Sequence, residues 1–447
     1  MINRKGFFIL PSELFCNVVK RADKDENLNI TLKNIFINIE RSAEGKISEN
    51  DFKGLFTSID LNSNKLETSL ETRNKEIANI MHQIAKMNFG NFMDNKVDLL
   101  GDAYEYLISM YSANAGKVGG QYFTPQEVSE LLTKLAIKDK SKILKVYDPA
   151  CGSGSLLLKA IKVLGVDNIE DGFYGQEKDA TTYNLCRMNM FLHNVSFDKF
   201  NIENGNTLLK PSSFHKEKAP FDVIVSNPPY SQGWPGKDNI LLINDDRFSP
   251  AGILAPKRNS DFAFIMHSLS WLSTDGLAAI VCFPGIFTRT NNKAEPAIRK
   301  YLIDNNFIDT IIELPENLFF GTSITTYIMV LNKSKKDNCV LFIDATDEFY
   351  KVTNNNKLSN ENIENILNLY KNREGKDNIA RLVSYDEIKD KEYNLSVSKY
   401  VDKKDKKEKV DIKVLNQKIE DIVIKTNQLR NEINKIINKI EGSNENK

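Results

Sequence analysis

The sequence predicts an α/β fold with a mostly parallel sheet, an N-terminal helical domain and a C-terminal coiled-coil helix. Three observations support this. Short apolar strands alternate with helical periodicities between residues 125 and 332. A Gly-rich turn follows the first strand, and a polar Pro-Pro turn follows the fourth. Ligands of open α/β sheets bind beyond the carboxyl ends of the strands, so we expect the two turns to form one site.

Composition places the chain among globular proteins without a membrane span. The sequence has 447 residues, of which 41% are hydrophobic and 27% charged, as in ordinary soluble domains. We predict three domains: a helical domain at 1–118, a catalytic domain at 119–400, and a linker with a coiled-coil helix at 401–447. The five cysteines are scattered without a CxxC pair, so the pattern favours neither a disulfide framework nor a zinc site. No signal peptide is evident, and we expect a cytoplasmic, metal-free protein.

The N-terminal part shows helical rather than strand periodicity. Apolar residues recur at helical spacing in 75–89 and in 97–111, and the segment alone is most simply a packing module. Residues 118–125 (VGGQYFTP) interrupt this pattern. Thr124 followed by Pro125 then predicts a helix that extends to about residue 136, with Thr124 as its N-cap.

Alternating elements follow in the order expected for a doubly wound sheet. The predicted strands are 143–148, 173–176, 201–203, 222–225, 277–283, 308–314 and 325–332, and the predicted helices between them are 156–164, 180–193, 260–272 and 295–304. We expect the segment after residue 332 to be mostly helical and charged, without room for a large separate domain that reads bases.

The Gly-rich turn at 149–155 (PACGSGS) favours close approach of a ligand to the backbone. Asp148 at the first strand end is a candidate partner for an ammonium group, and Glu177 at the next strand end for ribose hydroxyls. Carboxylate, ammonium and ribose together describe S-adenosylmethionine. The turn lacks the third glycine of the dinucleotide pattern, which counts against NAD. A purely structural βα turn is the alternative for this segment.

The turn Asn227-Pro228-Pro229-Tyr230 follows the strand at 222–225 and suits a flat ring with an exocyclic amino group. The Asn227 carboxamide oxygen and the Pro228 carbonyl are two acceptors for the hydrogens of adenine N6. Tyr230 offers a face on which an extruded base can stack. These four residues are the predicted catalytic set. Taken alone, the motif is also compatible with an ordinary Pro-rich turn.

With these motifs in hand, the chain resembles the modification subunits of type I restriction–modification systems, which are adenine-N6 DNA methyltransferases. The matching stretches are LLGDAYEYLI (99–108), GGQYFTP (119–125), YDPACGSGSLL (147–157), FYGQEKD (173–179), GNTL (205–208), DVIVSNPPYS (222–231) and RFSPAGILAPKRNSDFAFIMHSL (247–269). The resemblance implies a Rossmann-like methyltransferase fold. It also implies that the FTP element cradles the cofactor's adenine, with Phe123 stacking and Thr124 as a polar anchor.

The residues expected to bind the cofactor combine both lines of reasoning. They are Gln121, Tyr122, Phe123, Thr124, Pro125, Gln126, Asp148, Ala150, Cys151, Gly152, Ser153, Gly154, Ser155, Glu177, Asn206 and Asn227. The chain departs from the family pattern in two ways. Many amino-methyltransferases have Asp where Asn206 stands, and we expect Asn206 to accept from the amino group of the cofactor's adenine without a charge. Related subunits usually have more helices before the segment that matches GFFILPSELF (6–15), so a short N-terminal domain is expected to affect assembly.

The long segment 231–259 is rich in Gly and Pro and is expected to close over a flipped base. Its candidates for phosphate contact or stacking are Trp234, Lys237, Arg247, Lys257 and Arg258. A solvated surface loop is the alternative.

The apolar pattern of the C-terminal tail indicates that the chain binds a partner protein. Apolar residues recur in a heptad seam from Ile412 to Ile440, and one helix cannot bury such a seam alone. Packing on the chain's own body is one alternative. The resemblance implies a DNA-specificity subunit shared by two copies of this chain, with a separate restriction subunit. Lys plus Arg number 60 and Asp plus Glu 60, so the chain also lacks the basic surplus of a lone DNA binder.

Two other functions are compatible with part of the sequence. One is a different NPPY methyltransferase that acts on protein glutamine or RNA guanine. The FTP element before the Gly-rich turn and the tail argue against it. The other is an inactive assembly subunit, against which the intact NPPY and Gly-rich turns argue.

Overall fold

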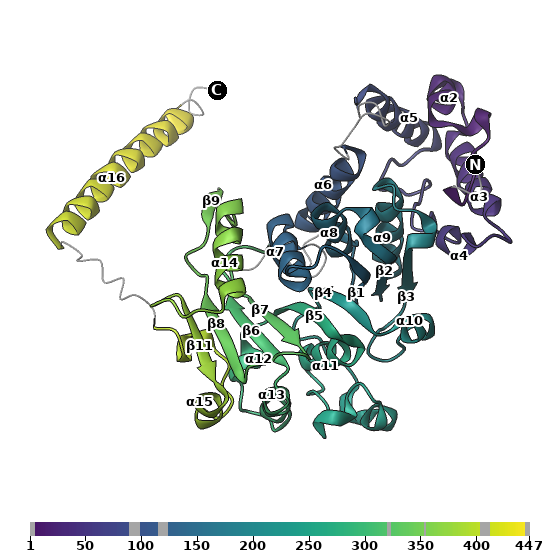
Figure 1. The fold of residues 1–447 in the computed structure, drawn as a ribbon. Coiled ribbons are helices and arrows are strands. Elements are labelled where there is room, and N and C mark those ends of the chain that lie inside the picture. Colours follow the sequence, from purple (N-terminus) through teal and green to yellow (C-terminus); the bar gives the residue numbers. More distant parts are fainter. Residues whose placement is uncertain are drawn as a thin grey trace. The chain divides into compact units, whose positions relative to one another are not determined.

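The computed structural model of the chain describes residues 5–88, 99–114, 124–319, 323–352, 355–402 and 412–442. It contains two separate compact units, Met1–Asp402 and Lys403–Lys447. In chain order (Figure 1) the helices and strands are α2 Phe15–Val18, α3 Leu28–Ser42, α4 Glu49–Phe52, α5 Leu70–Lys86, α6 Leu99–Asn114, α7 Gln126–Ile137, β1 Ile143–Asp148, α8 Ser155–Leu164, β2 Ile169–Glu177, α9 Ala180–Leu192, β3 Phe200–Asn204, α10 Ser213–Lys218, β4 Phe221–Ser226, α11 Asp261–Trp271, β5 Leu272–Cys282, α12 Gly285–Thr288, α13 Ala294–Asp304, β6 Ile308–Glu313, β7 Tyr327–Asn332, β8 Cys339–Asp344, β9 Tyr350–Val352, β10 Asn355–Lys357, α14 Asn360–Asn372, β11 Ala380–Ser384, α15 Tyr385–Asp390 and α16 Ile412–Gly442.

The central element of the first unit is a 9-stranded sheet in the order β11-β8-β6-β7-β5-β4-β1-β2-β3. Strands β1 to β5 are parallel to their neighbours within this set, and β6 is parallel to β8. Strand β7 runs antiparallel to β5 and β6, and β11 antiparallel to β8. The predicted mostly parallel sheet is therefore confirmed.

Helices cover both faces of this sheet. Residues of α7, α8, α9 and α14 form one apolar core with the strands, and residues of α11, α13 and α15 form the other (Figure 1). The central strands are buried on both sides, which is why β4 contains the continuous apolar run Val223–Val225 rather than an alternating pattern. This packing fixes the strand ends at which the polar turns begin.

The N-terminal helices pack on α9 of the α/β part. Arg187 of α9 is buried, and its Nη1 donates to the carbonyl oxygens of Asn50, Asp51 and Lys53 at 3.1, 3.0 and 3.0 Å. Phe52 stacks on Phe191 with ring centroids 4.6 Å apart. One guanidinium thus satisfies the carbonyls at the end of α4, and the Phe52–Phe191 contact joins the same two helices.

Beyond residue 332 the fold contains more sheet than the sequence reasoning predicted. Strand β8 lies beside β6, and β11 beside β8. The run Val340–Ile343 is buried on both faces, and short apolar runs of this kind are easily missed between charged segments. None of the helices within the described ranges combines the length and the apolarity that a membrane crossing requires.

The second unit is the helix α16. Ile419, Ile422, Leu429 and Ile433 of the predicted seam are each more than half exposed. The side chains of Ile412, Leu415, Ile436 and Ile440 lie outside the described ones. That the seam packs in a coiled coil stays a prediction.

Candidate functional site

The site lies where the strand order changes direction. Strands β2 and β3 lie on one side of β1, and β4 and β5 on the other, so a crevice opens beyond the carboxyl ends of β1 and β4. Asp148 ends β1 and Ser226 ends β4. Ser226 Oγ donates to Asp148 Oδ1 at 2.9 Å, and this hydrogen bond joins the two strand ends.

A cavity of about 340 Å³ occupies this crevice. Its size is at the lower end of the range for small-molecule sites. Five predicted site residues line it together: Ala150, Glu177, Asn206, Asn227 and Pro229. Its other lining residues are Pro149, Gln176, Lys178, Asp179, Gly205, Thr207, Leu208, Gln232, Gly233, Trp234, Ser260 and Phe264.

Backbone donors hold the carboxylate of Glu177. Gly152 N donates to Glu177 Oε2 at 3.1 Å, and Asp179 N donates to Glu177 Oε1 at 2.8 Å. Burial nevertheless raises the pKa of Glu177 above its ordinary value. Gly152 has φ +54°, a backbone conformation that favours glycine. The Gly-rich turn and the end of β2 are therefore one rigid arrangement.

Asp148 directly precedes Pro149 and Ala150, which line the cavity, and it is fully buried. Its Oδ1 accepts from Ala150 N at 3.0 Å and from the Ser226 hydroxyl. Its Oδ2 is buried and has no hydrogen-bond partner among the described residues. Burial raises the pKa of this carboxyl to about 7. A buried acceptor without a donor is the feature that a cationic ligand group would satisfy.

The remaining residues of the Gly-rich turn, 151 and 153–155, are buried. Cys151 is buried, with its Sγ 4.0 Å from the Sγ of Cys186. Gly154 has φ +84°, and a Cβ built there would lie 2.7 Å from Cys186 Sγ. Ser153 and Ser155 are buried as well. These residues shape the turn by packing, and none of the four lines the cavity.

Asn206 begins a tight turn that forms another wall. Its Oδ1 accepts from the backbone N of Leu208 and Leu209 at 3.1 and 3.3 Å. The Thr207 hydroxyl donates to the Pro149 carbonyl at 2.6 Å. The Asn206 oxygen that we predicted as an acceptor for the cofactor's adenine is thus already bonded within its own turn.

The carboxamide of Asn227 is held from both ends. Its Nδ2 donates to Thr124 Oγ1 at 3.0 Å, and the Tyr230 hydroxyl donates to its Oδ1. Thr124 is buried, whereas Asn227 and Tyr230 are partly buried. Pro228 is buried, and of the four residues of the turn Asn227 and Pro229 line the cavity.

The predicted cap of α7 was wrong. The helix begins at Gln126 with Pro125 in the N-cap position and has no side-chain cap, because the Thr124 hydroxyl accepts from Asn227 instead. The Nε2 of Gln126 is buried without a partner among the described residues. The predicted cofactor residues Gln121, Tyr122 and Phe123 lie outside the described residues.

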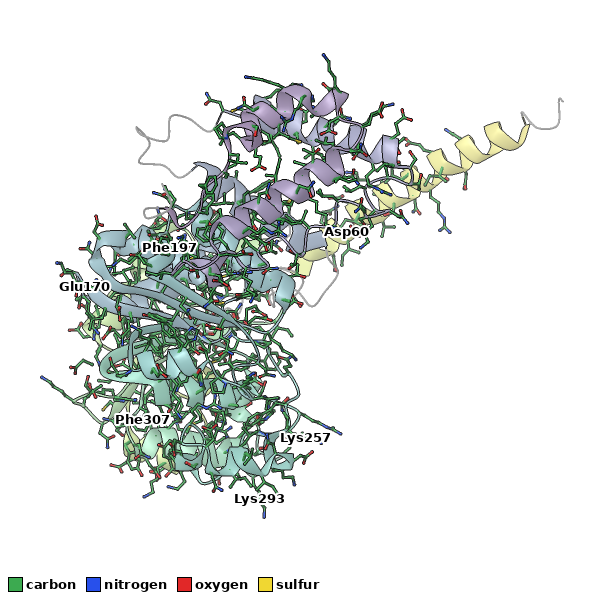
Figure 2. All side chains as sticks on the ribbon, turned by 90° about the vertical axis from the view of Figure 1, so that its right-hand side faces the viewer. Asp60, Glu170, Phe197, Lys257, Lys293 and Phe307 are labelled. Carbon is green, nitrogen blue, oxygen red and sulfur yellow. The ribbon has the colours of Figure 1, made fainter. Side chains whose placement is uncertain are left out.

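The segment 231–259 folds back against the site. Trp234 is buried, lines the cavity and donates from Nε1 to the Pro256 carbonyl at 3.0 Å. The expectation that Arg247 reaches phosphates was wrong, because this side chain is buried and pairs with Asp245. Lys257 projects outward (Figure 2) and pairs with Asp238, and Lys237 and Arg258 are exposed.

Several residues of the site were not predicted. Ser226 could have been found, since it directly precedes Asn227 at a strand end. Gln176 donates to the Lys210 carbonyl at 2.9 Å and accepts from Ser212 N at 3.1 Å, and Phe264 lines the cavity from α11. No local pattern signals these two residues, because their partners are distant in the sequence.

Comparisons with known proteins agree with the geometry. The family model described as N-6 DNA Methylase matches residues 95–409. The chain is 48% identical to the type I restriction enzyme MpnII methylase subunit of Mycoplasma pneumoniae, over 98% of this chain and 83% of that protein. It is 33% identical to the MjaVIII methylase subunit of Methanocaldococcus jannaschii, over 78% of this chain and 60% of the relative.

Solved structures of type I methyltransferase and modification subunits are similar to this chain as well. The type I restriction-modification system methyltransferase subunit from Streptococcus thermophilus superposes with a TM-score of 0.81 at 38% identity, covering 89% of this chain and 82% of that one. A modification subunit of a putative type I restriction enzyme from Vibrio vulnificus, at 18% identity and a TM-score of 0.56, shares the fold.

Proposed function

This chain belongs to the N-6 DNA methylase family, and from that membership we propose that its cavity holds S-adenosylmethionine next to a target adenine bound by Asn227. The chain is a DNA adenine-N6 methyltransferase and a type I restriction enzyme methylase subunit. Within this activity, we propose that one group of residues binds the cofactor and another binds the target adenine. The observation that carries the proposal is that candidate cofactor residues and candidate target residues line the same cavity.

The residues around the Gly-rich turn fit the cofactor. Asp148 Oδ2 is a buried acceptor without a partner among the described residues, and it suits the ammonium group. Glu177 is held rigidly at the cavity wall and suits the ribose hydroxyls. Gly152 at positive φ keeps the turn free of a side chain. When bound, S-adenosylmethionine supplies an electrophilic methyl group.

The NPPY turn handles the target base. Asn227 Oδ1 and the Pro228 carbonyl accept the two hydrogens of adenine N6, so the nitrogen lone pair is drawn out of the ring plane and becomes a better nucleophile. Tyr230 stacks on the flipped base. Pro229 and Trp234 form apolar parts of the wall and exclude water from the amino group. No covalent bond to the protein is required.

We also propose that the chain acts in the cytoplasm on double-stranded DNA, in a complex of two copies with one specificity subunit and a restriction subunit. The exposed apolar side chains of α16 and the zero net charge support this assembly. One structure of similar fold, at 18% identity, comes from work on complex assembly of the type I restriction-modification system.

The test separates the two groups of residues. Glu177→Ala and Gly152→Val are expected to weaken S-adenosylmethionine binding in calorimetry, the first by loss of ribose hydrogen bonds and the second by strain at φ +54°. Asn227→Ala is expected to bind the cofactor nearly as wild type yet transfer no tritiated methyl group to DNA in the assembled complex. Unchanged cofactor affinity in both variants, or normal transfer by Asn227→Ala, contradicts the proposal. Parallel assays on protein and RNA distinguish other NPPY substrates.

A further inference from the structure

Arg247 is buried at the centre of a network that spans the site. Its Nη1 donates to the Thr207 carbonyl at 2.8 Å, and its Nη2 to the Leu208 carbonyl at 2.9 Å. Its Nε and Nη2 bind the two oxygens of Asp245 at 2.9 and 2.7 Å. Arg247 is only 5% exposed although its guanidinium carries a charge, so the ion pair and the two carbonyls compensate for its burial.

His267 extends this network to β1. Arg247 Nη1 lies 3.2 Å from His267 Nδ1, and His267 Nε2 lies 2.9 Å from the Tyr147 hydroxyl. Arginine can only donate, so Nδ1 is the acceptor and the proton of the neutral imidazole is on Nε2, which donates to Tyr147. Tyr147 directly precedes Asp148 in β1. All three side chains are buried. The hydrogen bonds are donated from Arg247 to His267 and from His267 to Tyr147.

The network touches two walls of the cavity. On one side it holds Thr207 and Leu208, which line the cavity directly after Asn206. On the other side Arg247 belongs to the segment 231–259, and the adjacent Phe248 packs edge-on against Trp234 with centroids 5.4 Å apart. Trp234 lines the cavity on the side that follows the NPPY turn. One residue therefore links the turn after β3 to the segment after β4.

We propose that Arg247 is a positioning residue that couples the cofactor wall to the segment over the target base. The proposal rests on the cofactor site described above. A ligand that orders the Asn206–Leu208 turn also fixes the Thr207 and Leu208 carbonyls, and through them the guanidinium, Phe248 and Trp234. Filling of the cofactor pocket thus restrains the base-side segment through Arg247, and a lysine replaces the arginine only in part because it lacks the planar set of donors.

Hydrogen exchange on the full-length chain, with and without S-adenosylhomocysteine, tests this coupling. In the wild type the ligand is expected to slow exchange in both 205–209 and 231–259. In Arg247→Met we expect slowed exchange in 205–209 only, and an affinity for S-adenosylhomocysteine that is about 10-fold weaker, since charge-assisted hydrogen bonds are lost. Arg247→Lys should show an intermediate response of 231–259. Arg258→Met, which removes an exposed charge from the same segment, should match the wild type.

The possible outcomes separate the coupling from the proposed function. If the ligand slows exchange of 231–259 in Arg247→Met as much as in the wild type, the coupling is overturned. A wild type that responds in 205–209 but not in 231–259 also overturns it, while the cofactor site stands. A wild type that responds in neither segment refutes the cofactor site and the coupling with it. If circular dichroism shows that Arg247→Met does not fold, the test uses Arg247→Lys. A response of 231–259 in Arg247→Lys equal to that of the wild type then refutes the coupling.

Discussion

The Tyr230 hydroxyl donates to Asn227 Oδ1, the atom that the proposed reaction needs as an acceptor for the target amino group. The other end of the same carboxamide donates to Thr124 Oγ1 at 3.0 Å. The Tyr230 hydroxyl and adenine N6 therefore both donate to one oxygen, which has two lone pairs, whereas Thr124 fixes which end of the amide faces the target. The hydroxyl and the ring of Tyr230 therefore have different roles: the hydroxyl bonds to Asn227, and the ring is proposed to stack on the target base.

Removing the Tyr230 hydroxyl should do little harm. Tyr230→Phe keeps the stacking face and removes one donor to Asn227 Oδ1, so we expect it to retain most of the single-turnover methylation rate. Tyr230→Ala should lose about 10-fold or more, because stacking on a base contributes about 1–3 kcal/mol. Rapid-quench methylation by the assembled complex measures both rates. A Phe variant as slow as the Ala variant would show that the hydroxyl itself is required.

Thr124 should orient the catalytic carboxamide. Thr124→Val has nearly the same shape but cannot accept from Asn227 Nδ2, and we expect kcat to fall about 10-fold, with one hydrogen bond lost and the amide free to rotate. Thr124→Ser keeps the hydroxyl and should restore most of the rate. Melting temperatures of the two variants control for stability. Equal kcat values for Val and Ser would contradict the assignment.

Asp148 should make cofactor affinity depend on pH. Burial raises the pKa of this carboxyl to about 7, so the ammonium of the cofactor meets a neutral acid below that pH and a carboxylate above it. Affinity measured by calorimetry should therefore rise as pH increases through about 7. Asp148→Asn should bind more weakly and lose this dependence. An Asn variant with the wild-type pH profile would exclude Asp148 as the titrating group.

The same carboxyl affects the stability of the cofactor-free protein in the opposite sense. The folded state binds a proton more tightly than the unfolded state, whose carboxyl has its ordinary pKa of 3.8. Stability from this group is fully present below that value and is lost as pH rises to about 7. Thermal melts of the wild type and of Asp148→Asn across this range measure the difference.

The apolar seam of α16 should be required for assembly. Ile422→Glu and Leu429→Glu place charges among exposed apolar side chains, and we expect either to weaken the complex with the specificity subunit. Asn431→Glu, an exposed position off the seam, is the matched control. Deletion of residues 409–447 should abolish the complex and leave cofactor affinity unchanged. Light scattering after size exclusion measures assembly, and a complex that survives the deletion would refute this prediction.

The sequence by itself determined the order of the elements and the strand ends that carry chemistry. Alternating apolar runs and helical periods predict the strands. Side-chain chemistry at the strand ends indicates Glu177 and Asn227 as candidates, and the family resemblance adds Asn206. These signals are local, since a turn and the strand before it are adjacent in the chain, and parallel strands bring their carboxyl ends to the same edge of the sheet.

Only the tertiary structure decided which of these groups are bonded to which. Thr124 and Asn227 lie 103 residues apart, and no local pattern pairs them. In the sequence Arg247 reads as a phosphate ligand, but the fold buries it because Asp245, Thr207 and Leu208 offer enough acceptors to offset the loss of water. Likewise Gly154 must be glycine because Cys186 fills the space beside it. Hydrogen bonding and packing among distant residues depend on strand order, which local periodicity does not encode.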